Sequence, residues 1–105
     1  MMNIKIKENS LLAKIAARKM GSKDAAIVIG NTIHLFGATR KDLLDNPTWL
    51  RHELKHVEQT LRLGLASFLT LYLLDSIRNG YQNNRFEIEA RNAESTPSIL
   101  EKYLK

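Results

Sequence analysis

His52, Glu53 and His56 form the sequence His-Glu-x-x-His, which sets two imidazoles and a carboxylate at helical spacing. In an α-helix, residues four apart lie about one turn apart on the same face, so both histidines can offer a ring nitrogen to one metal ion. The motif is typical of Zn²⁺ sites in which the glutamate stands beside an open coordination position. The pattern therefore predicts a zinc-dependent hydrolysis in which Glu53 is the general base that takes a proton from the attacking water.

The helix that must hold these residues has a marked start and an apolar face. Asn46 is a preferred N-cap residue, and Pro47 suits the first helical position, where a backbone N–H has no intrahelical partner. Away from the histidines, four apolar residues follow at i, i+4, i+7 and i+11: Leu50, Leu54, Val57 and Leu61. We therefore expect one side of this helix to face the core and the other to face a site that Trp49 shields from water.

Two elements are expected before the motif helix. Ser10 and Gly21 suit the ends of a helix over residues 11–20, in which four residues form a weak amphipathic side: Leu12, Ile15, Ala16 and Lys19. The β-branched segments 25–29 and 32–36, joined by Gly30 and Asn31, predict a β-hairpin. Residues 37–45 then connect the hairpin to the motif helix.

Three helices are expected after the motif helix. Gly64 ends it, and a leucine-rich helix over residues 65–77 follows. Asn83 or Asn84 caps a helix over residues 85–94. A short helix over residues 98–104 is expected to turn four apolar side chains inward: Ile99, Leu100, Tyr103 and Leu104. The sequence thus predicts one mostly helical α+β domain spanning residues 1–105, with a single hairpin ahead of the motif helix.

The leucine-rich segment is short for a membrane span. No charged residue lies between Arg62 and Asp75, whereas a helix needs about 20 apolar residues to cross a bilayer. We expect this helix to be buried against the motif helix. The alternative is that residues 63–77 form a membrane-surface or protein-docking helix, because so many leucines are a large share for a small core.

Composition and charge narrow the class of protein. The chain has 105 residues, 44% of them hydrophobic, and no cysteine, so disulfides and thiolate metal sites are excluded. The first residues lack the apolar segment of a secretory signal, so we expect a cytoplasmic location, peripheral to the membrane in the docking alternative. The net charge is +5, and basic residues crowd residues 5–23. We expect a solvated basic surface rather than a nucleic-acid interface, since no recognition pattern accompanies the charge.

A catalytic zinc site uses three protein ligands, so the two histidines need a third partner. The remaining histidine, His34, lies in the hairpin and is expected either to be a partly buried strand residue or to contact substrate. On the helix over residues 85–94, three residues share an inward face: Phe86, Ala90 and Ala93. Glu87 and Glu94 flank that face and Glu89 points elsewhere, which leaves more than one acidic candidate.

The motif from His52 to His56, followed by the segment from Phe86 to Arg91, resembles the minimal gluzincin plan. The resemblance covers about residues 25–94 and is strongest to small domains related to the HtpX-like and CaaX-prenyl-protease-like zinc peptidases. In those families the second motif reads Glu-x-x-Ala-Asp, and its first glutamate is the third zinc ligand. The resemblance therefore implies a zincin-like peptidase, Glu87 as third ligand, and a hairpin edge that holds an extended peptide.

Two positions depart from the family pattern. Arg91 stands where those families have an aspartate that orients a ligand histidine, and Glu58, Glu89 and Glu94 are the candidates to replace it. Lys55 places a positive charge inside the pentapeptide, where it opposes a metal ion unless its stem carries the ammonium group away to solvent.

The predicted activity is that of a zinc metallopeptidase acting on a peptide or protein substrate. Tyr72 and Tyr81 are the available phenols that could donate a hydrogen bond to a developing oxyanion. One alternative is a zinc-binding module of the same fold that does not turn over and acts through its structure or a partner. A second alternative is a basic nucleic-acid-associated protein in which the His-Glu-x-x-His motif is accidental.

Overall fold

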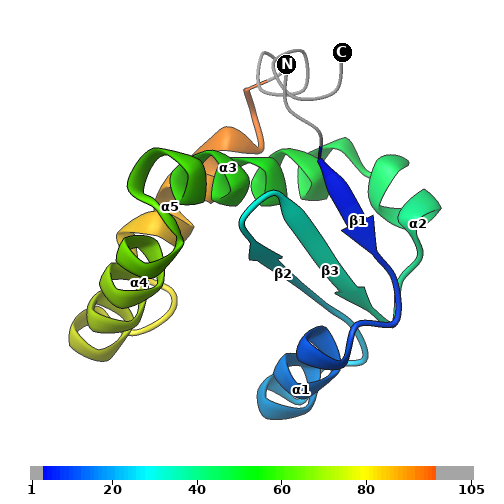
Figure 1. The fold of residues 1–105 in the computed structure, drawn as a ribbon, viewed down its shortest axis with the longest axis horizontal. Coiled ribbons are helices and arrows are strands. Elements are labelled where there is room, and N and C mark those ends of the chain that lie inside the picture. The colour runs from blue at the N-terminus through cyan, green and yellow to red at the C-terminus, as the bar shows by residue number, and fades with distance from the viewer. Residues whose placement is uncertain (1–3, 97–105) are drawn as a thin grey trace.

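The structure, a computed structural model, describes residues 4–96. Its elements in chain order are β1 (Lys5–Lys7), α1 (Leu11–Met20), β2 (Ala25–Ile29), β3 (Thr32–Phe36), α2 (Arg40–Leu44), α3 (Pro47–Leu63), α4 (Leu65–Asn79) and α5 (Arg85–Ala93) (Figure 1). The predicted mostly helical α+β fold is confirmed. The helix predicted over residues 98–104 lies outside the described residues.

The predicted hairpin is confirmed with the expected bounds. Strands β2 and β3 pair antiparallel, so that Val28 lies opposite Ile33 and Ala26 opposite Leu35. The turn between them depends on Gly30, whose φ of +63° is left-handed and costs glycine nothing. In Figure 1 the sheet lies between α3 and α1, so the hairpin forms the middle of the molecule.

The core forms where α3 crosses the sheet. Asn46 caps α3 by accepting a hydrogen bond from the Trp49 N–H, as its sequence position indicates. The fully packed residues come from α3, the hairpin, α2 and α5: Leu50, Leu54, Val57, Val28, Ile33, Leu35, Leu43 and Ala93. Leu61 was expected in this group but is 42% exposed. It lies in the last turn of α3, and the five-residue strands cover only part of a helix of 17 residues.

Helix α1 packs through its alanines. Ser10 caps its start and Gly21 ends it with φ of +67°, as expected. The buried residues are Ala13 and Ala17, whereas Leu12 and Ile15, on the predicted amphipathic side, are exposed. Small side chains let the helix approach the strands closely, and this contact leaves the larger apolar side chains outside.

Two elements were not predicted. Strand β1 has three residues and pairs parallel with β3, at the edge of the sheet opposite β2. Helix α2 lies within the connection after the hairpin and begins with a capping box, in which Thr39 and Asp42 each accept a hydrogen bond from the other's backbone N–H. Its Leu43 is fully buried in the core, so this short helix closes the end of the core next to β1.

The expectation that the leucine-rich helix is buried is wrong. Helix α4 leaves α3 at Gly64 and points away from it (Figure 1). Of its 15 residues only Phe68 is buried, while Leu73 is 60% and Ile77 72% exposed. One side of α4 contacts α3, and the apolar opposite side faces solvent. Among residues 4–96 no single helix is long and apolar enough to span a membrane; only α3 and α4 together have the length and composition, and this pair is bent by 116°.

Gly37→Ala is expected to lower the free energy of unfolding by about 3 kcal/mol or more, because strain and overlap add. Gly37 has φ of +78°, and a Cβ built there would lie 2.3 Å from the carbonyl oxygen of Lys23. Gly30→Ala is the matched control: its φ is +63° but its Cβ would meet nothing within 4 Å. In urea denaturation, the control should lose only ~1 kcal/mol of free energy of unfolding, the cost of an alanine in the left-handed conformation. Equal costs for the two variants would contradict this steric argument.

Candidate metal centre

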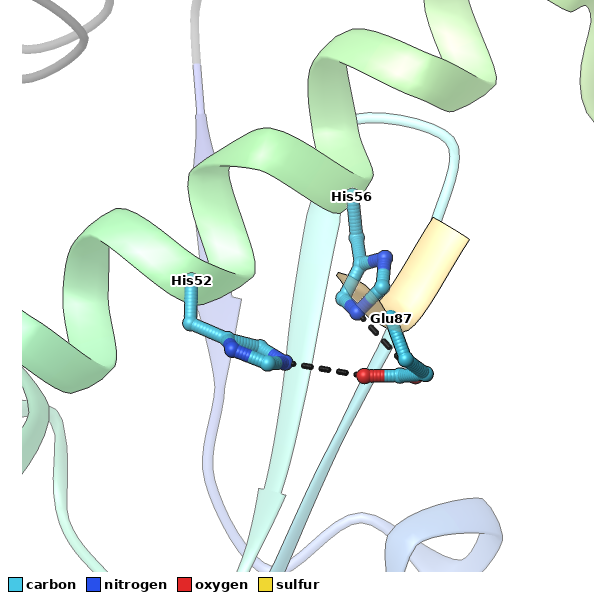
Figure 2. A group of neighbouring side chains, drawn as sticks. All are labelled: His52, His56 and Glu87. Atoms are coloured by element: carbon cyan, nitrogen blue, oxygen red, sulfur yellow. Dashed lines mark hydrogen bonds and ion pairs between the residues drawn. The ribbon is translucent and has the colours of Figure 1, made fainter. Parts of the chain in front are cut away.

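Helices α3 and α5 bring the predicted ligands together. His52 and His56 project from one face of α3, and the carboxylate of Glu87, in the first turn of α5, faces both rings (Figure 2). Asn84 fixes the start of α5 by accepting hydrogen bonds from the N–H groups of Phe86 and Glu87. The site is therefore built between two helices whose relative position is set by buried contacts.

The start of α5 is also held by α4. The Asn84 amide donates to the Tyr72 carbonyl at 2.9 Å and to the Ser76 hydroxyl at 2.8 Å. Asp75 accepts a hydrogen bond from the Arg85 N–H at 2.7 Å. The turn that carries Glu87 is thus attached to α4 as well as to α3.

The ligand atoms have separations that suit one small cation. Nε2 of His52 lies 3.0 Å from Oε1 of Glu87, and Nε2 of His56 lies 3.2 Å from its Oε2. One donor atom from each of the three residues lies within 4.8 Å of the others. Ligands about 2.0–2.1 Å from a tetrahedral Zn²⁺ are about 3.3 Å apart, so this donor set fits such an ion after small shifts.

The second nitrogen of each histidine is bonded away from the cluster. Nδ1 of His52 lies 2.7 Å from Oε2 of Glu94, and Nδ1 of His56 lies 2.9 Å from Oε1 of Gln59. Such bonds place the Nδ1 proton, orient the ring and leave Nε2 for a metal. Of the three glutamates that were candidates to orient a ligand histidine, Glu58, Glu89 and Glu94, it is Glu94 that bonds to His52. Gln59 was not predicted as a residue of the site, although its position three residues after His56 puts it on the same face of the helix.

Charges in the cluster stabilise one another. Burial alone would raise the pKa of Glu87, but hydrogen bonds from His52 and His56 hold this pKa well below its usual range. Burial disfavours charged His52, yet its bond to Glu87 and the charge of Glu53 outweigh this effect and raise the pKa of His52 to about 9. Burial likewise opposes a charge on His56, but the hydrogen bond of His56 to Glu87 outweighs this effect and raises the pKa of His56. A cation that binds here must therefore displace protons from the histidines.

Glu53 is buried beside the cluster without belonging to it. Its side chain is 6% exposed, and burial raises its pKa to about 7, against the positive charges of His56 and His52. A carboxylate with a pKa near neutrality is suited to general base catalysis, because it is both partly ionised and basic enough. The Trp49 side chain lies close enough to Glu53 to act against this rise in pKa. Trp49 also lines the more open hollow beside Glu53, next to the site that it was expected to shield.

Both predicted tyrosines lie at the cluster. The Tyr72 hydroxyl donates a hydrogen bond to Oε2 of Glu87, and burial together with that carboxylate raises the pKa of Tyr72 above its usual value. Tyr81 is half-exposed, and burial with the charges of Glu87 and Glu53 raises its pKa to about 12. Tyr72 is thus already bonded to a ligand side chain, whereas Tyr81 is a protonated donor at the surface of the site.

Two hollows meet at the site. An apolar cleft of about 290 Å³ lies between α1, β2 and α4, and its lining includes Phe68 and Tyr72. A more open and more polar hollow of about 400 Å³ continues past Trp49. His52, Glu53 and Tyr81 line both hollows. A ligand in either hollow therefore reaches His52, Glu53 and Tyr81.

Three other residues that the sequence pointed to, Lys55, Arg91 and His34, do not belong to the cluster of His52, His56 and Glu87. Nζ of Lys55 lies 2.6 Å from Oε1 of Glu58, so its charge is directed away from the histidines. The Arg91 guanidinium donates to the Gln82 carbonyl. Nδ1 of His34 lies 3.0 Å from the Ser10 hydroxyl, and His34 lines neither hollow. The structure does not place His34 where it would contact a substrate at this centre. Side chains alternate along β3, and the neighbours of His34 in this strand face α3, so the His34 side chain lies on the other face of the sheet.

In comparisons with known proteins, no family model, no curated protein and no solved structure matches the chain. The class of site is therefore argued from its own geometry: two histidines and a glutamate on adjacent helices, with a buried carboxylate beside them.

Proposed function

We propose that this protein is a zinc-dependent peptidase, in which His52, His56 and Glu87 bind the metal and Glu53 is the general base. One observation carries the proposal. Both Nε2 atoms face one carboxylate, while both Nδ1 atoms are bonded elsewhere, to Glu94 and Gln59. An ordinary pair of surface histidines has no need of this double orientation, whereas metal-ligating histidines almost always have it.

The chemistry divides between the metal and the chain. Zn²⁺ held by these three residues would supply a water with a pKa near 7 and would polarise the scissile carbonyl. Glu53 accepts the proton of the attacking water and delivers it to the leaving amine, which its pKa of about 7 supports. Tyr81 is placed to donate a hydrogen bond to the developing oxyanion, while Tyr72 holds the Glu87 carboxylate.

A peptide is the substrate that best fits the surroundings of the cluster. The two hollows that meet at His52, Glu53 and Tyr81 leave room on both sides of a scissile bond. The cleft on one side is apolar, being lined by Ala26, Val28 and Phe68 among others. These features favour an extended chain with an apolar residue on that side, since pockets of this kind select side chains by burial.

Metal removal tests the proposal. The protein purified without chelator should contain one zinc per chain and should cleave members of a mixed peptide library, with cleavage products read by mass spectrometry. Treatment with 1,10-phenanthroline followed by desalting should remove cleavage, and added Zn²⁺ should restore it. Zinc bound at one per chain without cleavage would reject the peptidase. A chain that binds no zinc would reject the whole assignment.

A non-catalytic zinc module of the same arrangement is the second candidate. The observation that favours it is that Glu87 already has three partners, His52, His56 and Tyr72, so the cluster ties three helices together by itself. In such a module the metal would only strengthen that tie, and Glu53 would have no role. The base variant argued in the Discussion separates the two candidates.

Glu94→Gln is expected to weaken zinc binding about 10–100-fold, the usual effect of removing a carboxylate that orients a ligand histidine. The amide still accepts a hydrogen bond from His52 Nδ1, so the fold should be kept. Competition with a coloured chelator measures the affinity. Asp45→Asn is the matched control, because Asp45 is an exposed carboxylate that pairs with Lys41 and lines neither hollow. An equal loss in the control would assign the effect to net charge alone.

A further inference from the structure

Exposed apolar side chains continue the walls of the cleft outward on α4. Leu69, Leu73 and Ile77 follow at i, i+4 and i+8, so they form one stripe along the helix. Leu69 lines the cleft, and all three are exposed. The acidic residue of this helix, Asp75, is directed to α5, where it accepts a hydrogen bond from the Arg85 N–H. The other charged residue of the helix, Arg78, is basic.

Helix α1 forms the opposite wall with the same kind of surface. Ala16 and Met20 line the cleft, and Leu12 lies one turn before Ala16. Leu12 and Met20 are exposed because the helix packs through its two buried alanines. Both α1 and α4 lie below α3 in the view of Figure 1, and residues of both helices line the cleft.

The charged residues of α1 all have the same sign. Helix α1 contains Lys14, Arg18 and Lys19 and no acidic residue. Arg18 and Lys19 are exposed, and Lys14 lies over the Phe36 ring, 5.9 Å from its centroid. An apolar helix face flanked by cations is the pattern of helices that lie in the interface of an anionic bilayer.

A lipid surface explains this face better than a protein partner does. Stable protein interfaces carry a polar rim and about one hydrogen bond per 100–200 Å². Residues 65–74 contain no charged side chain, and the two ridges are separated by the cleft. A fluid layer of headgroups and acyl chains can fit both ridges at once without specific polar partners.

We propose that α1 and α4 dock this protein on an anionic membrane surface with the mouth of the cleft toward the lipid. Leu73, Ile77 and Leu12 enter the interface, and Arg18 and Lys19 bind the headgroups. The cleft then receives polypeptide that lies at or emerges from the membrane. The docking itself depends only on the exposed faces of α1 and α4, and so stands whether or not the centre is catalytic.

Vesicle flotation of the full chain tests the docking. The protein should float with vesicles of phosphatidylcholine mixed with phosphatidylglycerol and stay behind with vesicles of phosphatidylcholine alone. Raised salt should weaken the binding. The double variant Arg18→Gln/Lys19→Gln should bind about 30-fold more weakly, since each basic residue near an anionic surface contributes about a fivefold gain. Leu73→Asn/Ile77→Asn should lose about tenfold or more through its apolar contacts.

Matched controls carry the same changes elsewhere. Arg40→Gln/Lys41→Gln removes two charges from α2, at the other end of α3 from α4 (Figure 1), and should bind as the wild type does. Ile88→Asn changes an exposed apolar residue of α5 that does not line the cleft, and should also bind normally. Circular dichroism of every variant verifies the fold.

Three outcomes overturn the proposal. The first is a wild-type chain that binds neither vesicle, as when a second copy covers the face. The second is equal binding to both vesicles. The third is an equal loss of vesicle binding in the α1 and α2 charge variants. In that case the net charge of the protein, and not this face, would be what attracts it to the vesicles. Size-exclusion chromatography with light scattering then identifies a dimer if one forms.

Discussion

Glu53→Gln is expected to keep bound zinc and stability and to lose peptide hydrolysis by about 10²–10⁴-fold, the contribution of a positioned general base. The amide has nearly the shape of the carboxylate but cannot accept the proton. Glu53 is buried at the junction of both hollows and does not belong to the ligand cluster, so the metal should remain. Product formation under single-turnover conditions, with zinc content measured on the same samples, gives the answer.

Glu87→Gln is the control that distinguishes a base from a ligand. An amide is a weaker metal ligand, so this variant should lose zinc and melt at a lower temperature. Opposite behaviour, with zinc lost in Glu53→Gln and kept in Glu87→Gln, would exchange the two assignments. Retained hydrolysis in Glu53→Gln with full zinc would remove Glu53 from the mechanism.

His52→Ala and His56→Ala should each abolish tight zinc binding, because two remaining ligands hold the ion poorly. Zinc stabilises the folded chain by about 4 kcal/mol when its free concentration is a thousand times Kd. For a domain of this size the melting temperature should therefore fall by about 15 °C or more relative to the zinc-loaded wild type. Differential scanning fluorimetry with and without zinc measures this fall.

The His34→Ala variant serves as the comparison. His34 bonds to Ser10 and lies apart from the cluster, so it should keep zinc affinity. It should also respond to added zinc by the same rise in melting temperature as the wild type. A zinc effect that survives in His52→Ala but not in His34→Ala would move the site to the hairpin.

Local signals in the sequence predicted the hairpin and the helix ends, because these features depend on nearby residues. Gly30 permits the turn, Asn46 and Asn84 cap their helices, and Gly64 ends α3. Helix α2 carried such a signal too, since Thr39 and Asp42 have the spacing of a capping box. Strand β1 had none: three residues pair with β3 only once the chain has folded, so no local pattern marks them.

The apolar patterns were harder to interpret than the caps. A run of leucines predicts a helix, but whether its sides are covered depends on where neighbouring helices lie. Helix α4 diverges from α3, so Leu73 and Ile77 have no covering element among residues 4–96. The same limit applied to Glu94, since the orientation of α5 decides which glutamate reaches Nδ1 of His52.

The attachment of α5 to α4 would make the hold on the proposed metal ion depend in part on a surface helix. Asn84 and Tyr72 bind Glu87 and its turn to α4, and α4 has one buried side chain to keep it in place. Segments with few buried contacts open locally at a lower free energy than the core does. Each opening of α4 removes the contacts of Tyr72 and Asn84 from this turn, while α5 stays packed on α3. We therefore expect openings of α4 to loosen the hold on a bound ion, and a surface that clamps α4 to slow metal exchange.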